Sequence, residues 1–384
     1  MSSDLSPHLL GQGPIWPIEI VRGRNDRVWD PGGRMFYDFY GGHAVALTGH
    51  AHPRVRKAIN REMRKLIFYS TSTRLNVRER AAATLAAHLP ARLSRMFFCN
   101  SGAEANENAL KIALQLTGRE RLIAFRGSFH GRTALTLSVT DDPRLNAPFA
   151  RFAPPIDWLP FADPTALDGV DFHEAAAVIL EPIQSMGGVR VAPDAWLGEL
   201  IRRAHAAGCL VIFDEIQTGL GRTGTWFYAS RPELEPDMVT LAKGLASGIP
   251  VAATTVTADI ASALKPHDLG STFGGGPVAM AALLATFEVL EREDCLSSVQ
   301  SLSQKLVTAI NRLPGCTALG RGFLLGIQSP KPGRWLCDQL FSRGFLTGPS
   351  RDPLVTRLLP PLTLRPQSVD FFLEALSEVL GESG

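Results

Sequence analysis

The sequence lacks the features of membrane, secreted and nucleic-acid-binding proteins. No run of eighteen apolar residues occurs, although 45% of the 384 residues are hydrophobic, so we expect no membrane-spanning helix. The start carries no charged segment followed by an apolar one, so no signal peptide is expected. The 39 Lys+Arg nearly balance 37 Asp+Glu without a long basic run, which argues against nucleic acid as a partner. We therefore expect a cytoplasmic protein with a large buried core.

Several catalytic and metal-binding patterns are also missing. The five cysteines form no CxxC pair, and their odd number indicates reduced core thiols rather than disulfides or a zinc site. His50, His52 and His130 have no cysteine or carboxylate partner at metal-ligand spacing, so we expect no metal. Neither a G-x-S-x-G elbow nor a Walker A motif occurs.

Lysine is scarce as well. Only seven of the 39 basic residues are lysines, so arginine carries most of the positive charge. A position that keeps lysine in such a chain stands out, because a lysine amine can act as a nucleophile and a guanidinium cannot.

Short apolar runs alternate with helix-like segments through the middle of the chain. This alternation predicts an α/β fold with a mainly parallel sheet. The runs that we interpret as buried strands are residues 96–99, 122–125, 177–180, 210–213 and 238–241.

The two ends of the chain differ from the middle. Residues 14–50 are rich in aromatic and glycine residues, and residues 277–384 open with a long Ala/Leu-rich helix from Val278 to Leu290. We expect residues 49–276 to form a large domain and both terminal segments, 1–48 and 277–384, to form a smaller α+β domain.

Each predicted strand ends in polar residues. These ends are Asn100–Glu104, Gly127–Arg132, Glu181-Pro182, Asp214-Glu215 and Ala242–Gly244. Ligands of open α/β sheets bind beyond the carboxyl ends of the strands, so five such ends predict one shared crevice. The alternative is that each end is an ordinary polar turn.

Three of these ends together match the needs of pyridoxal phosphate. Ser101 and Glu104 form a capping-box pattern, and an exposed helix N-terminus binds anions such as phosphate. Lys243 follows an apolar strand, where desolvation lowers the pKa of its amine, and Asp214 ends the strand one crossover earlier. A Schiff-base lysine, a carboxylate for a ring nitrogen and a phosphate site are the parts that this cofactor requires. A plain helix cap and a solvated turn lysine are the alternatives.

One rival motif is present. Residues 219–224 match G-x-G-x-x-G, the dinucleotide fingerprint. Polar residues separate the motif from the preceding strand, and no convincing helix follows it, so the context of a nucleotide site is missing.

Several blocks of the sequence resemble one enzyme family. They are Asn100–Glu107, Phe129–Arg132, Glu181–Gln184, Phe213–Gly224, Leu241–Gly244 and Gly270–Gly275. In this order they are similar to the class III pyridoxal-phosphate aminotransferases of fold type I, and most of all to the acetylornithine/ornithine branch. The resemblance implies that the large domain binds pyridoxal 5'-phosphate and that the enzyme is a homodimer.

The resemblance also implies a role for each matching residue. Lys243 would form the Schiff base and move the substrate proton, while Asp214 would pair with the ring nitrogen. The other cofactor contacts would come from Ser101, Gly102, Ala103, Phe129, His130, Ile216, Gln217 and, across a dimer interface, Thr272. Arg132 and Arg357 would bind substrate carboxylates, and Glu181 also belongs to the expected substrate site.

One departure from that branch bears on the substrate. The branch reads Gln-Gly-Glu-Gly-Gly where this chain has Gln184-Ser185-Met186-Gly187-Gly188. The missing Glu of the relatives pairs with the arginine matching Arg357, and Met186 cannot do so. Our hypothesis is that Arg357 stays open, which favours substrates with a carboxylate near the reacting amine.

The sequence therefore predicts a ping-pong aminotransferase. The donor is a glutamate-like or ω-amino acid such as N-acetylornithine, and the acceptor is a 2-oxo acid or aldehyde. Decarboxylation-coupled transamination or aminomutase chemistry on the same cofactor remains an alternative, as does a catalytically idle homologue that acts as a partner subunit.

Overall fold

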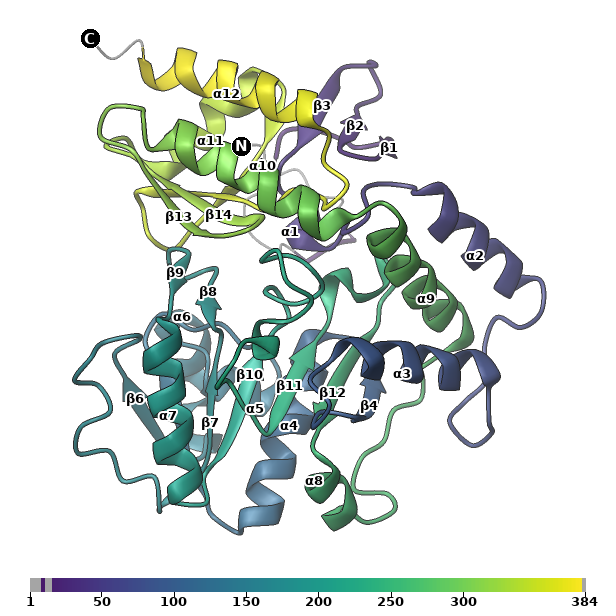
Figure 1. The fold of residues 1–384 in the computed structure, drawn as a ribbon, viewed down its shortest axis with the longest axis vertical. Helices are drawn as coiled ribbons and strands as arrows, with labels where there is room; N and C mark the ends of the chain where they lie inside the picture. Colours follow the sequence, from purple (N-terminus) through teal and green to yellow (C-terminus); the bar gives the residue numbers. More distant parts are fainter. Residues whose placement is uncertain (1–7, 11–15, 382–384) are drawn as a thin grey trace.

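The computed structural model describes residues 8–10 and 16–381. Its largest sheet has seven strands and lies in the lower half of Figure 1. In spatial order the strands are β4 (Arg95–Cys99), β12 (Ala252–Val256), β11 (Met238–Leu241), β10 (Leu210–Asp214), β7 (Ala175–Leu180), β5 (Arg121–Phe125) and β6 (Ile156–Leu159). β12 pairs antiparallel with both of its neighbours, and the other pairings are parallel. The predicted mainly parallel α/β fold is confirmed.

Helices cover both faces of this sheet, because alternate strand residues point to opposite sides. Ala177 and Ile179 of β7 pack in one apolar cluster with helix α4 (Gly102–Thr117). Val178 of the same strand packs in a second cluster with helix α7 (Asp194–Ala206). All six residues of β7 are buried, which explains why its sequence is a continuous apolar run.

The five predicted strands are all present, and the two remaining strands of the seven-stranded sheet, β6 and β12, were not predicted. β6 has the sequence Ile-Asp-Trp-Leu and follows a pair of prolines. β12 carries two threonines among small residues. Neither segment has the long apolar run that marks the central strands, because β6 is an edge strand and β12 buries hydroxyls that donate to backbone carbonyls.

Smaller sheets lie beside the large one. An antiparallel sheet has the order β13 (Thr317–Arg321), β14 (Leu324–Gln328), β17 (Val355–Leu358), β16 (Gly348–Pro349). Another joins the two ends of the chain in the order β1 (Arg22–Arg24), β2 (Arg27–Trp29), β3 (Met35–Asp38), β15 (Phe345–Leu346), with β3 parallel to β15. A two-stranded ribbon pairs β8 (Ile183–Gln184) with β9 (Arg190–Val191).

The remaining helices surround these sheets. They are α1 (Gly41–Ala44), α2 (Pro53–Met63), α3 (Asn76–His88), α5 (Ala134–Ser138), α6 (Pro143–Asn146), α8 (Ala258–Ala263), α9 (Pro277–Arg292), α10 (Cys295–Ile310), α11 (Gly333–Ser342) and α12 (Pro366–Gly381). Three short 3₁₀ helices are η1 (Ala147–Phe152), η2 (Tyr228–Ser230) and η3 (Lys243–Ala246). α9 is the long helix predicted at Val278–Leu290.

All five cysteines are buried and none is in a disulfide. Within residues 8–10 and 16–381, no helix has the length and apolar character needed to cross a membrane.

Candidate active site

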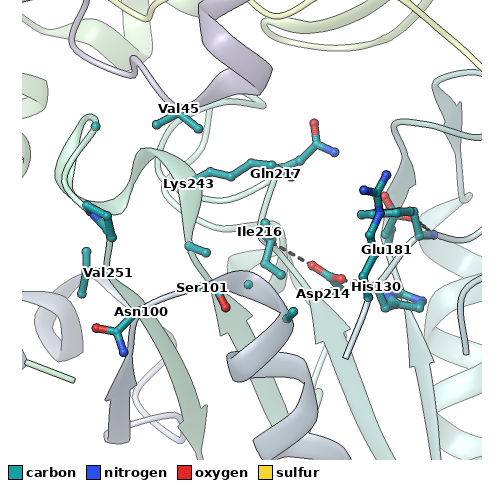
Figure 2. Close-up of a pocket in the computed structure, with 18 of the residues that line it drawn as sticks. Val45, Asn100, Ser101, His130, Glu181, Asp214, Ile216, Gln217, Lys243 and Val251 are labelled. Carbon is teal, nitrogen blue, oxygen red and sulfur yellow. Dashed lines mark hydrogen bonds and ion pairs between the residues drawn. The ribbon is translucent and has the colours of Figure 1, made fainter. Parts of the chain in front are cut away.

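A cavity of about 460 Å³ opens where the central strands end (Figure 2). Most of the predicted site residues line it, namely Ser101, Gly102, Ala103, Phe129, His130, Arg132, Glu181, Asp214, Ile216, Gln217 and Lys243. Arg357 and Thr272 are not among its lining residues. The shared crevice predicted from five strand ends is therefore present.

Helix α4 presents its N-terminus to this cavity. Ser101 is the N-cap, and its Oγ accepts a hydrogen bond from Glu104 N at 3.2 Å. Glu104 Oε2 accepts from Asn100 N at 3.0 Å rather than from the N–H of the N-cap Ser101, so only the Ser101 half of the predicted capping box is present. The N–H groups of Gly102 and Ala103 have no carbonyl partner within the helix and are available to an anion.

Asp214 is held at the end of β10 by three donors. Asn106 Nδ2 lies 2.7 Å and His130 Nδ1 lies 2.8 Å from Asp214 Oδ2, and Ile216 N donates to Oδ1 at 3.1 Å. Only 4% of Asp214 is exposed, and His130 is 2% exposed. This arrangement fixes the direction of a buried carboxylate.

Lys243 enters the cavity from the first residue of η3. Its φ of 47° is unusual for a residue with a side chain, and such strain concentrates at functional sites. Burial lowers the pKa of the Lys243 amine to about 8, although Asp214 and Glu181 act in the opposite direction. Among the described residues, Lys243 Nζ has no hydrogen-bond or ion-pair partner. A partly neutral, unpaired amine therefore faces the space that Asp214 and Ile216 also line (Figure 2).

Glu181 is a second buried carboxyl group of the cavity. Phe129 N donates to Glu181 Oε1 at 3.0 Å, and Ser185 N donates to Oε2 at 3.3 Å. Burial raises the pKa of Glu181 to about 7, against the opposing effect of His130. Glu181 thus ties the backbone of Phe129 to that of Ser185.

Arg357 lies on β17 and is 2% exposed. Its Nε donates to Pro349 O at 2.7 Å, Nη1 to Ser185 Oγ at 3.1 Å and Nη2 to Tyr40 Oη at 3.2 Å. Among the described residues no carboxylate lies within ion-pair distance of it. Its charge nevertheless helps to lower the pKa of Lys243, so Arg357 acts on the cavity electrostatically.

Arg132, expected to bind substrate, and Thr272, expected at a dimer interface, are both exposed. Arg132 lines the main cavity and also a neighbouring apolar cavity of about 590 Å³, with no side-chain partner in the described part of the chain. Thr272 lies on the surface next to Phe273, which is 64% exposed.

Sequence reasoning did not single out several residues of the site. Asn106, which orients Asp214, also accepts from Thr240 Oγ1 at 2.6 Å. Tyr40 and Ser185 hold Arg357 but come from distant segments, so only the folded chain reveals them. The polar block 100–107 contained the one usable signal, a buried asparagine in the middle of a helix.

The glycine motif at residues 219–224 is a structural loop. No α-helix follows it, and the next regular element is η2. Arg222, within this loop, is 1% exposed and donates to the carbonyls of Phe323 and Pro360. The loop therefore joins the central sheet to the C-terminal segment.

The side chains of the cavity fit pyridoxal phosphate. An amine, a carboxylate and free helix N–H groups are all present, and buried His130 Nε2 has no hydrogen-bond partner in the part of the chain that the structure describes. A Cβ on Gly102 would lie 2.6 Å from Ile216 Cδ1, so glycine is needed to keep Ile216 close to the helix start. Lys243 would hold the cofactor covalently, and Gly102 and Ala103 would hold its phosphate.

Comparisons with known proteins agree with this fit. Residues 11–380 match the family model of class-III aminotransferases. The chain is 40% identical over 370 residues to an acetylornithine aminotransferase of Streptomyces coelicolor, covering 95% of this chain and 92% of the relative. An acetylornithine aminotransferase of Methanopyrus kandleri is 35% identical, with 96% of each chain covered.

Solved structures give the same result. The ornithine aminotransferase of Toxoplasma gondii superposes with a TM-score of 0.89 and 29% identity, covering 97% of this chain and 93% of that chain. An (S)-enantioselective omega-transaminase of Thermomicrobium roseum superposes with a TM-score of 0.87 and 27% identity, covering 98% and 96%. The chain belongs to the class III aminotransferases, pyridoxal-phosphate-dependent enzymes that move an amino group from an amino donor to an oxo acid acceptor.

Proposed function

We propose that the strand-end cavity transfers amino groups by a ping-pong mechanism and that Lys243 is its central residue. The observation that carries this proposal is an unpaired lysine amine with a pKa of about 8 in one cavity with a fixed carboxylate, Asp214. At neutral pH a useful fraction of this amine is uncharged, which both nucleophilic attack and proton abstraction require.

When bound, pyridoxal phosphate supplies a sink for the electrons released as the substrate Cα–H bond breaks. Asp214 would face the ring nitrogen and favour its protonated form, and Lys243 would hold the cofactor and serve as the base for the substrate Cα proton. Gln217 would donate to the ring oxygen, and Ile216 and Phe129 would pack against the ring. Ser101, Gly102 and Ala103 would hold the phosphate, and His130 lies 2.8 Å from the Asp214 carboxylate that it supports.

The preferred donor carries a carboxylate next to its reacting amine, as L-glutamate does. Arg357 supports this choice because all three of its observed partners are uncharged. Met186 stands next to Ser185 and offers no carboxylate to neutralise the guanidinium. A 2-oxo acid acceptor presents the same carboxylate, so Arg357 serves both half-reactions.

A second donor class is favoured by Arg132. This arginine lines the cavity without an acidic partner among the described residues, so it suits the distant carboxylate of an ω-amino donor. N-acetylornithine is such a donor, and the relatives named acetylornithine aminotransferase support it.

Single-turnover half-reactions separate these candidates. Protein loaded with pyridoxal phosphate is mixed with L-glutamate, L-alanine, N-acetylornithine or ornithine, and the loss of the visible band is followed. Fast loss with L-glutamate is expected, and fast loss with ornithine-type donors alone would contradict the role of Arg357. Released carbon dioxide would instead indicate decarboxylation-coupled chemistry, an intramolecular amine shift would indicate an aminomutase, and no turnover would indicate an idle partner subunit.

The functional unit is a homodimer in which Thr272 contacts the phosphate of the partner's cofactor. Exposed apolar side chains beside Thr272 support this part of the proposal. Ile67 is 67% and Phe273 is 64% exposed, and the Phe68 and Phe273 rings lie 5.2 Å apart. They line a cavity of about 540 Å³ that shares Asn100 with the main cavity. Sedimentation of the loaded protein tests the dimer.

Residues 49–276 form the cofactor domain, and the described parts of the segments 1–48 and 277–384 form the smaller one. The pairing of β3 with β15 supports this division, because it joins the two terminal segments in one sheet. The five free, buried cysteines support a reducing, cytoplasmic location.

A further inference from the structure

Ser185 lies where the carboxylate-binding and cofactor-binding parts of the site meet. It follows strand β8 and is completely buried. Its Oγ donates to Gln217 Oε1 at 3.0 Å and accepts from Arg357 Nη1 at 3.1 Å. One hydroxyl therefore contacts both Arg357, which is proposed to bind the substrate carboxylate, and Gln217, which is proposed to donate to the cofactor ring oxygen.

The bond to Arg357 leaves that guanidinium ready for a carboxylate. A guanidinium has five N–H donors, and Arg357 uses three of them, on Pro349 O, Ser185 Oγ and Tyr40 Oη. The two that remain lie one on each terminal nitrogen. These two N–H groups are the donors that Arg357 has left for a carboxylate.

The same hydroxyl sets the orientation of the Gln217 amide. Arg357 can only donate, so Ser185 accepts from it and has its single proton left for Gln217. Only Oε1 of Gln217 can accept that proton. Gln217 Nε2, which has no protein partner among the described residues, is thereby free to donate toward the cavity that Gln217 lines.

We propose that Ser185 is a positioning residue that couples carboxylate recognition by Arg357 to the hydrogen bond between Gln217 and the cofactor ring oxygen. This inference rests on the proposed function of the cavity. Glu181 supports the arrangement, because its carboxyl accepts from Ser185 N and so fixes the backbone that carries the hydroxyl.

The test compares S185A with S303A in protein loaded with pyridoxal phosphate. Ser303 is a buried serine of α10 whose Oγ donates to Gln300 O, outside the residues that line the cavity, so S303A controls for the loss of a hydroxyl. The first readout is the midpoint pH at which the visible band of the lysine-bound cofactor titrates. The second is the KM for a 2-oxo acid acceptor, measured separately from kcat.

S185A is expected to raise the titration midpoint by about half to one pH unit, the equivalent of one ordinary hydrogen bond. The lysine-bound cofactor shares a proton between its nitrogen and the ring oxygen, and a donor from Gln217 favours the form that has lost this proton. The KM for the 2-oxo acid is expected to rise about three- to tenfold, because Arg357 loses one of its three anchors. S303A should change neither value.

Double variants show whether Ser185 acts through its neighbours. In a Gln217→Ala background, S185A should no longer move the midpoint, and in an Arg357→Lys background it should no longer raise the KM. Additive effects would contradict the coupling, as would an S185A protein that matches S303A or that binds no cofactor. If the wild-type protein itself shows no visible band, the proposed function fails, which is a separate result.

Discussion

The residues proposed to hold the cofactor, here called the cofactor side, and the residues proposed to bind substrate carboxylates, here called the substrate side, differ in how their charges are paired. Asp214 on the cofactor side receives three donors, two of which are side chains buried with it. Arg357 on the substrate side has only neutral partners, and Arg132 has none among the described residues. The Asp214 carboxylate is thus paired within the protein, whereas under the proposed function a substrate carboxylate supplies the counter-charge of Arg357 and Arg132.

The largest predicted effect concerns the cofactor side. Lys243→Ala and Lys243→Arg should each lower kcat about 10⁴-fold or more and remove the visible band, because neither side chain provides an amine. Absorbance and steady-state kinetics check this. Exposed Lys265→Ala is the control and should keep both. A Lys243→Ala protein that keeps the band would contradict the assignment.

Next in size is the loss of the fixed carboxylate. Asp214→Asn should lower kcat about 10²- to 10³-fold, because the ring nitrogen loses its anionic partner. Asp237→Asn is the matched control, since Asp237 is a partly buried carboxylate that accepts from Val211 N outside the cavity lining. Equal effects of the two substitutions on kcat would show that Asp214 has a structural role only.

The substrate side should respond in KM rather than in kcat. Arg357→Lys should raise the KM for a 2-oxo acid about 10- to 100-fold, because an ammonium cannot form the two parallel bonds. Arg365→Lys, which alters an ion pair with Asp26, should leave KM unchanged. If Arg357→Lys lowered kcat and left KM constant, Arg357 would not act in substrate binding, and the two sides would not differ in this way.

A carboxylate introduced at position 186 tests directly whether an unpaired Arg357 selects the donor. Met186→Glu should slow the half-reaction with L-glutamate about three- to tenfold relative to N-acetylornithine, because a carboxylate near Arg357 competes with the substrate. Met186→Gln controls for polarity and should have a smaller effect. Unchanged donor preference would contradict the hypothesis that Arg357 selects the donor.

The smallest effect is the pH dependence of cofactor capture. With a pKa of about 8, the neutral fraction of Lys243 grows about fivefold between pH 7 and 8 and only about twofold between pH 8 and 9. The rate at which cofactor-free protein binds pyridoxal phosphate should follow this curve in stopped-flow absorbance. A rate that keeps rising tenfold per pH unit to pH 9 would indicate an amine without a lowered pKa.

The sequence predicted the cavity positions of Asp214 and Lys243 more readily than the surroundings of Arg357. Asp214 is the last residue of β10 and Lys243 lies two residues after β11, and the parallel pairing of these strands brings their ends together. Arg357 gave no such local signal, because its surroundings come from Tyr40 and Ser185, far away along the chain. The edge strand β6 and the reversed strand β12 were missed because neither reads as a long apolar run.

The central claim is that Lys243 holds the cofactor. Loaded protein is reduced with borohydride, digested and mapped by mass spectrometry. The account predicts one pyridoxyl group on the peptide that contains Lys243, and its loss when L-glutamate is added before reduction. A pyridoxyl group on any of the other six lysines instead, or on none, would contradict it.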